Sequence, residues 1–151
     1  MHVLDLIEVQ QPSETFSKII KSTNQYLRRN KGAAADFDIL KNVASLYRES
    51  VRATDLVARY GGEEFVVLLP HTDVASGRAL AERIRKAVAA EPVSFGEKGA
   101  VTITASIGIA SVLPVDEDDL KTVGDSLLAR ADVALYRAKA AGRNRVEAAT
   151  G

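Results

Sequence analysis

The feature that most constrains the fold is a very short connection between two apolar runs. Leu56–Tyr60 and Phe65–Leu69 both have the composition of β-strands, and only Gly61–Glu64 separates them. Because glycine adopts a positive φ without a Cβ clash, the Gly-Gly pair is suited to the tip of a β-hairpin. We therefore expect at least one antiparallel strand pair, onto which the rest of the chain must pack.

The same tip carries two adjacent carboxylates, Glu63 and Glu64, whose mutual repulsion does not help a hairpin to fold. Carboxylate oxygens are ligands that Mg²⁺ prefers. The bare backbone at Gly61 and Gly62 lets a ligand approach closely. The pattern predicts a site for a metal-bound polyphosphate, and the alternative is a solvated hairpin tip without function.

Hydrophobic periodicity predicts strands and helices on both sides of the hairpin. We expect a strand at 3–7, helices at 16–27 and from 36, a helix from 73, a strand at 101–112, a helix at 125–141 and a strand at 145–146. The strand at 101–112 alternates large apolar residues with small ones, so its small face can pack closely against a helix. Gly142 is expected to end the last helix as its C′ residue. This order predicts an α/β, or α+β sandwich, fold with a mixed central sheet of about five strands flanked by helices.

Composition excludes several classes of protein. The chain has no cysteine, which rules out a disulfide framework and a thiolate site. Lys+Arg and Asp+Glu both total 20, so a strongly basic nucleic-acid surface is not indicated. No apolar run approaches the roughly 20 residues that span a bilayer, and the first residues lack the regions of a signal peptide. We expect one domain, residues 1–151, that is soluble and cytoplasmic and has no membrane segment.

Four separated segments, in order, resemble the GGDEF family of diguanylate cyclase domains, in the form with Glu at the third position. They are Arg52–Asp55 with the following hairpin, Ala81–Arg85, Thr104–Ala110, and Arg130–Lys139 closed by Gly142–Asn144. The resemblance covers about residues 38–147, and residues 1–37 diverge from the family pattern. It implies a nucleotidyl-cyclase-like fold and a bacterial signalling domain that follows a sensor domain in a longer protein.

The resemblance implies that two GTP molecules condense into cyclic di-GMP and two pyrophosphates across a homodimer. Glu63 matches the family's metal carboxylate, and Glu64 assists the metal or the attacking hydroxyl. Lys139 and Arg143 match a basic pair that binds the terminal phosphates. Because they are four residues apart near a helix end, we expect them to share a helix face; the alternative is that they only complement the helix dipole. The cofactor implied is Mg²⁺, as two ions, with Mn²⁺ as an alternative.

Arg52 and Asp55 match the RxxD pattern that marks a product-inhibition site in the family, and Arg83 matches a second arginine of that site. Arginine can fork onto a guanine edge or a phosphate, and Asp can accept from guanine N1 and N2. The resemblance implies feedback, in which bound cyclic di-GMP cross-links protomers and holds the half-sites apart. The alternative for Arg52 and Asp55 is an ordinary surface ion pair.

The first strand of family members normally ends in Asp-x-Asp-x-Phe-Lys, which this chain lacks. Asp5 is the residue that could stand for the first metal aspartate, whereas another register places Phe16–Ile19 on the Phe-Lys portion. The residues that read guanine stay open; the candidates are Asn24, Asn30, Asp36 and Asp38. Three interpretations therefore remain: an active diguanylate cyclase, a receptor that binds cyclic di-GMP without turnover, or a chain whose first third is truncated or shuffled.

Overall fold

The computed structural model of this chain describes residues 4–8, 34–59, 65–90, 92–94, 100–112 and 120–150. The helix that we expect at 16–27 lies outside these ranges, and so does the hairpin tip at 61–64. No helix among the described residues is both long and apolar enough to cross a membrane.

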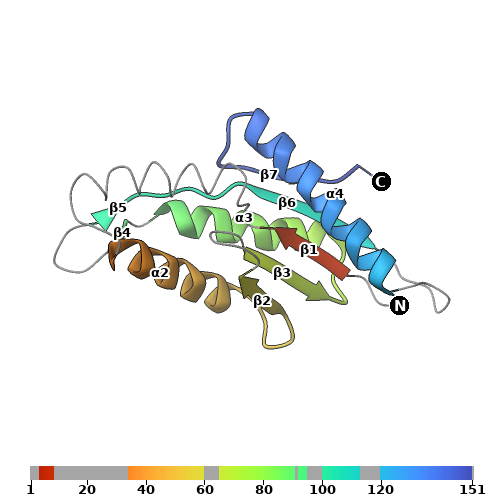
Figure 1. Cartoon of the computed structure of the whole chain (residues 1–151), viewed down its shortest axis with the longest axis horizontal. Coiled ribbons are helices and arrows are strands. Elements are labelled where there is room, and N and C mark those ends of the chain that lie inside the picture. The colour runs from red at the N-terminus through yellow and green to blue at the C-terminus, as the bar shows by residue number, and fades with distance from the viewer. Residues whose placement is uncertain are drawn as a thin grey trace.

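A five-stranded mixed sheet forms the centre of the fold (Figure 1). Its strands are β1 (Leu4–Glu8), β2 (Leu56–Arg59), β3 (Phe65–Pro70), β6 (Ile107–Val112) and β7 (Val146–Ala148). They lie in the order β2-β3-β1-β6-β7, in which only β6 and β7 are parallel. The predicted mixed sheet and the predicted antiparallel hairpin are both confirmed. A small second ribbon pairs β4 (Val93–Ser94) with β5 (Ala100–Val101).

Helices cover both faces of this sheet, which gives three layers (Figure 1). The helices α2 (Ala34–Ser50) and α3 (Val74–Ala90) pack against each other, and α3 contacts β1, β6 and β7. The helix α4 (Leu120–Ala140) contacts the same three strands. The first turn of α3 is stabilised by Asp73, whose Oδ1 accepts a hydrogen bond of 2.7 Å from the Ser76 amide. That bond lowers the pKa of the Asp73 carboxyl.

The strands alternate between the two layers, as a side-chain period of two requires. On β3, Phe65, Val67 and Leu69 are buried in the core formed with α2 and α3, whereas Val66 and Leu68 pack in the cluster that includes α4 residues. The two faces predicted for the strand near residue 107 follow the same rule: its large apolar residues join the α2–α3 core, and its small residues face α4.

Gly108 shows why one face of β6 must be small. A Cβ added there would overlap the Ala131 carbonyl oxygen and the Leu135 amide nitrogen, and would lie 2.9 Å from the Leu135 Cα. Since these are backbone atoms of α4, they cannot rotate out of the way. The glycine therefore allows α4 to lie directly on the sheet.

The single strand predicted for residues 101–112 is wrong. β5 ends at Val101, residues 102–106 form no strand, and β6 begins at Ile107. The strand begins where both neighbours can pair with it: Ile107 pairs with Val146, the first residue of β7, and Gly108 pairs with Glu8, the last residue of the antiparallel β1. The alternation at Ile103 and Ala105 instead reports burial, since both are in the core without being part of a ladder.

Candidate functional site

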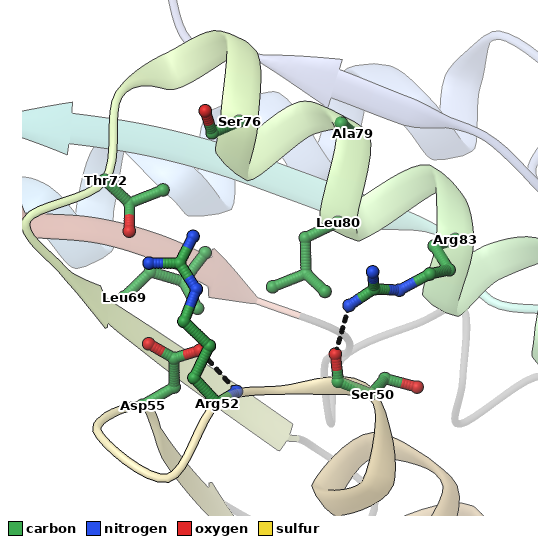
Figure 2. A pocket seen from close by; sticks show the side chains of 9 residues that line it. All are labelled: Ser50, Arg52, Asp55, Leu69, Thr72, Ser76, Ala79, Leu80 and Arg83. Carbon is green, nitrogen blue, oxygen red and sulfur yellow. Dashed lines mark hydrogen bonds between the residues drawn. The ribbon is translucent and has the colours of Figure 1, made fainter.

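A pocket of about 260 Å³ lies between α3, the end of β3 and the loop that joins α2 to β2 (Figure 2). It brings together all three residues that the sequence predicts for product binding, Arg52, Asp55 and Arg83, from two parts of the chain. The remaining lining residues are Ser50, Leu69, Thr72, Ser76, Ala79 and Leu80.

The turn that leads into β2 holds Arg52 and Asp55 in a fixed relation. The Arg52 amide donates to Asp55 Oδ2 at 2.8 Å, and the Asp55 amide donates to the Arg52 carbonyl at 3.1 Å. The other carboxylate oxygen, Asp55 Oδ1, is buried without a hydrogen-bond partner in the described part of the chain. A buried acceptor that lacks a donor is costly. A ligand that reaches Oδ1 with a donor group would satisfy this acceptor.

The two arginines enter the pocket from different elements. Arg52 extends from the loop past Asp55 toward Thr72, whereas Arg83 descends from α3 on the other side of Leu80 (Figure 2). An Nη2 hydrogen of Arg83 is donated to the Ser50 carbonyl, which ties α3 to the end of α2. The pocket thus offers guanidinium donors, one carboxylate acceptor and an apolar wall. That combination suits a ligand with a planar polar ring and phosphate groups.

The predicted phosphate-binding residues Lys139 and Arg143 lie at the end of α4, but not on one helix face. The helix ends at Ala140, and Gly142 follows with φ 119°. The Gly142 amide donates to the Lys139 carbonyl at 3.2 Å and the Arg143 amide to the Ala138 carbonyl at 3.0 Å, which is a Schellman motif. The prediction that Gly142 ends the helix is confirmed. The shared-face argument is wrong, because that same glycine turns the chain away before Arg143.

Two residues that the sequence reasoning did not single out hold the loop after α4. Ser106 Oγ accepts a hydrogen bond of 3.2 Å from the Asn144 amide, and Arg85 Nη1 donates to Asn144 Oδ1 at 2.9 Å. Both fall within segments that resemble the family, Ala81–Arg85 and Thr104–Ala110. Their place in those segments was the only signal of a role.

The predicted catalytic and metal residues of the hairpin, Gly61, Gly62, Glu63 and Glu64, lie outside the described residues. The residue that follows them, Phe65, is buried, and its ring packs edge-on against the ring of Tyr47, with the centroids 5.1 Å apart and an interplanar angle of 77°. Burial also raises the pKa of the Tyr47 phenol. The base of the hairpin is therefore anchored on α2.

The register of β1 bears on the second predicted metal residue. Asp5 pairs with Leu69, four residues from Phe65 and hence about 13 Å along the sheet from the base of the hairpin. Glu8 pairs with Val66, a single residue from Phe65. Because Mg²⁺ binds its ligands at about 2.1 Å, a carboxylate that shares an ion with the hairpin must lie near its base. Asp5 stays a prediction, and the register favours Glu8.

A complete metal cluster is not found within the described ranges: no three His, Asp or Glu residues there form a group that could hold an ion. Glu63 itself lies outside those ranges, so this search does not include the hairpin site. The donor set expected at the hairpin, carboxylates and no thiolates, fits a hard cation.

Comparison with known proteins identifies the family. A family model described as "Diguanylate cyclase, GGDEF domain" matches residues 32–145. Diguanylate cyclase DgcP of Pseudomonas aeruginosa is 46% identical over 119 residues, which are 78% of this chain and 16% of that protein. Diguanylate cyclase DgcM of Escherichia coli is 37% identical over 139 residues, which are 91% of this chain and 32% of that protein. This chain thus spans a third or less of the length of these two relatives.

Solved structures agree with the sequence comparison. The GGDEF domain of DgcB from Caulobacter crescentus, in complex with c-di-GMP, has a TM-score of 0.74 and 26% identity, and the match covers 97% of this chain and 77% of that one. The active GGEEF domain of a diguanylate cyclase from Vibrio cholerae has a TM-score of 0.73 and 26% identity, and the match covers 100% of this chain and 85% of that one.

Proposed function

Because this chain belongs to the GGDEF family of diguanylate cyclase domains, we propose that it condenses two GTP molecules into cyclic di-GMP and two pyrophosphates, and that it also binds its product. The relatives' names support the reaction. The observation that carries the second part is the pocket that Arg52, Asp55 and Arg83 line together, in which Asp55 Oδ1 lacks a hydrogen-bond partner among the described residues.

In this proposal each protomer of a homodimer holds one GTP, and each 3′-hydroxyl attacks the α-phosphate of the GTP on the other protomer. Glu63 would hold Mg²⁺ together with a strand carboxylate; Asp5 is the candidate from the sequence, and the register of β1 supports Glu8. When bound, Mg²⁺ neutralises triphosphate charge and favours release of pyrophosphate. Glu64 orients the attacking hydroxyl, and Gly61 and Gly62 leave room for the phosphates. Lys139 and Arg143 bind the terminal phosphates from the end of α4.

We expect the pocket to bind cyclic di-GMP through hydrogen bonds to guanine and through arginine contacts. Guanine N1 and N2 donate hydrogens, and Asp55 Oδ1 is an acceptor without a donor in the described part of the chain. Arg52 and Arg83 then contact the phosphates or the O6/N7 edge of guanine. In this proposal cyclic di-GMP that occupies the pocket cross-links two protomers, holds their GTP half-sites apart and so slows its own synthesis.

The experiment is to incubate the protein at a concentration that favours dimers with GTP and Mg²⁺, and to follow cyclic di-GMP by chromatography. The wild type should form cyclic di-GMP, and the Glu63→Ala variant should not. The Glu63→Ala variant should still bind cyclic di-GMP, because the pocket is formed by the 52–55 turn and α3. Loss of product binding in that variant would contradict two separate sites.

A second function, a receptor for cyclic di-GMP without turnover, is favoured by one observation. The pocket is fully assembled from described residues, whereas residues 1–37 lack the family's Asp-x-Asp-x-Phe-Lys. A protein that binds cyclic di-GMP but forms none at any concentration would be such a receptor.

A further inference from the structure

The loop after α4, residues 141–145, is connected to α3 through one side chain. Arg85 Nη1 donates to Asn144 Oδ1 at 2.9 Å and to the Asn144 carbonyl at 3.4 Å. One guanidinium therefore contacts both the side chain and the backbone of the residue that follows Arg143.

Arg85 is itself held in one orientation. Its Nε donates to Glu82 Oε2 at 3.0 Å, and its Nη2 lies 2.9 Å from the same oxygen. Its side chain is only 19% exposed. Because the guanidinium is planar and rigid, fixing one edge on Glu82 also fixes the edge that faces the loop.

The loop needs such support because of its backbone conformation. Arg143 and Asn144 have φ values of 66° and 46°, in the left-handed region. Residues other than glycine occupy this region only at a cost, and they persist there when surrounding contacts hold them. Two in succession are held here by the Schellman motif before them, by Ser106 Oγ, and by Arg85.

We propose that Arg85 is a positioning residue for GTP: by holding Asn144 it fixes the backbone of Arg143 and so directs the Arg143 guanidinium to the triphosphate. The inference rests on the proposed function, which assigns Arg143 to phosphate binding. Lys139 belongs to α4, and its backbone is held by the helix without Arg85.

The test separates binding from turnover by using 3′-deoxy-GTP with Mg²⁺, which lacks the attacking hydroxyl and cannot react. Calorimetry should show that Arg85→Ala weakens its binding on the order of tenfold, since small misplacements of a binding group have effects of this size or larger. Lys86→Ala is the matched control, because it removes one positive charge from the exposed neighbouring position of α3. It should bind as the wild type does. Arg85→Lys should fall between wild type and Arg85→Ala, because lysine lacks the fork that joins Glu82 to Asn144.

A double-variant cycle shows whether Arg85 acts through Arg143. In the Arg143→Ala background, removal of Arg85 should cause no further loss of affinity. If the two losses multiply instead, Arg85 acts by general stabilisation and the proposal is overturned. The Asn144→Gly variant keeps the left-handed backbone and removes Oδ1; it should weaken binding in the same direction and provides the test if Arg85→Ala fails to fold. Wild-type affinity in Asn144→Gly would overturn the proposal.

The outcomes distinguish this inference from the proposed function. If the wild type forms cyclic di-GMP and Arg85→Ala binds 3′-deoxy-GTP as tightly as the wild type, only the positioning role fails. If the wild type forms no cyclic di-GMP but binds 3′-deoxy-GTP in an Arg85- and Arg143-dependent way, turnover fails and the positioning role stands. If the wild type does not bind 3′-deoxy-GTP, both fail.

Discussion

Changing Asp55 to Asn replaces one hydrogen-bond acceptor in the pocket with a donor and leaves the shape of the side chain unchanged. Asp55 Oδ2 accepts from the Arg52 amide at 2.8 Å, and Oδ1 is the buried oxygen without a described partner. In Asp55→Asn the remaining carbonyl oxygen will stay on the Arg52 amide, because that backbone group is a donor. The new NH₂ group then takes the place of Oδ1 and faces the guanine donors.

The size of the effect follows from the bond that is lost. A hydrogen bond to a charged group contributes about 1.5–3 kcal/mol, and each 1.4 kcal/mol is about a tenfold change in affinity. Binding of cyclic di-GMP should therefore weaken by roughly 10- to 150-fold in Asp55→Asn. The melting temperature should hardly move, because the turn at 52–55 keeps its bonds.

Calorimetric titration with cyclic di-GMP measures the loss of affinity directly. The concentration of cyclic di-GMP that inhibits turnover should rise by the same factor. Glu49→Gln is the matched control, since it makes the same carboxylate-to-amide change on an exposed residue of α2 that does not line the pocket. Unchanged affinity in Asp55→Asn, or an equal loss in Glu49→Gln, would refute the assignment of this pocket to the product.

Three further variants test other parts of the structure. Tyr47→Phe removes a buried hydroxyl that has no hydrogen-bond partner among the described residues. The free energy of unfolding, measured by urea denaturation, should therefore rise by about 1 kcal/mol. A loss of stability would show that the hydroxyl is hydrogen-bonded. Gly108→Ala forces a Cβ into the Ala131 carbonyl and should destabilise the fold by about 3 kcal/mol, whereas a melting temperature equal to wild type would contradict the close packing of α4. Glu8→Gln should reduce Mg²⁺-dependent turnover on the order of 100-fold, and this loss should exceed the loss in Asp5→Asn. A larger loss in Asp5→Asn than in Glu8→Gln, measured by steady-state assay, would contradict the role inferred for Glu8 from the β1 register.

The sheet and the hairpin could be predicted from the sequence because local patterns determine them. Phe65–Leu69 is a continuous apolar run next to a Gly-Gly turn, which predicts a strand, and Gly142 marks the end of α4. The break between Val101 and Ile107 could not be predicted, because strand pairing depends on where β1 and β7 lie. Alternating apolar residues report burial, whether or not a neighbouring strand is present.

The product pocket could be predicted as a set of residues, but its geometry could not. The spacing of Arg52 and Asp55 anticipates their shared turn, whereas the approach of Arg83 depends on how α3 packs across the end of α2. In the same way, the contact between Arg85 and Asn144 joins residues 59 positions apart. No local pattern reports such a contact. The roles of the hairpin residues, of Lys139 and Arg143, and of residues 1–37 stay predictions.

In the proposed function this domain makes cyclic di-GMP with a hairpin carboxylate that is separate from its product pocket. The most direct measurement follows cyclic di-GMP formation from GTP and Mg²⁺ by wild type, Glu63→Ala and Asp55→Asn in parallel. We expect cyclic di-GMP from wild type, none from Glu63→Ala, and cyclic di-GMP from Asp55→Asn that continues to accumulate after the wild type has slowed. Equal product from Glu63→Ala and wild type, or none from Asp55→Asn while it remains folded, would contradict it.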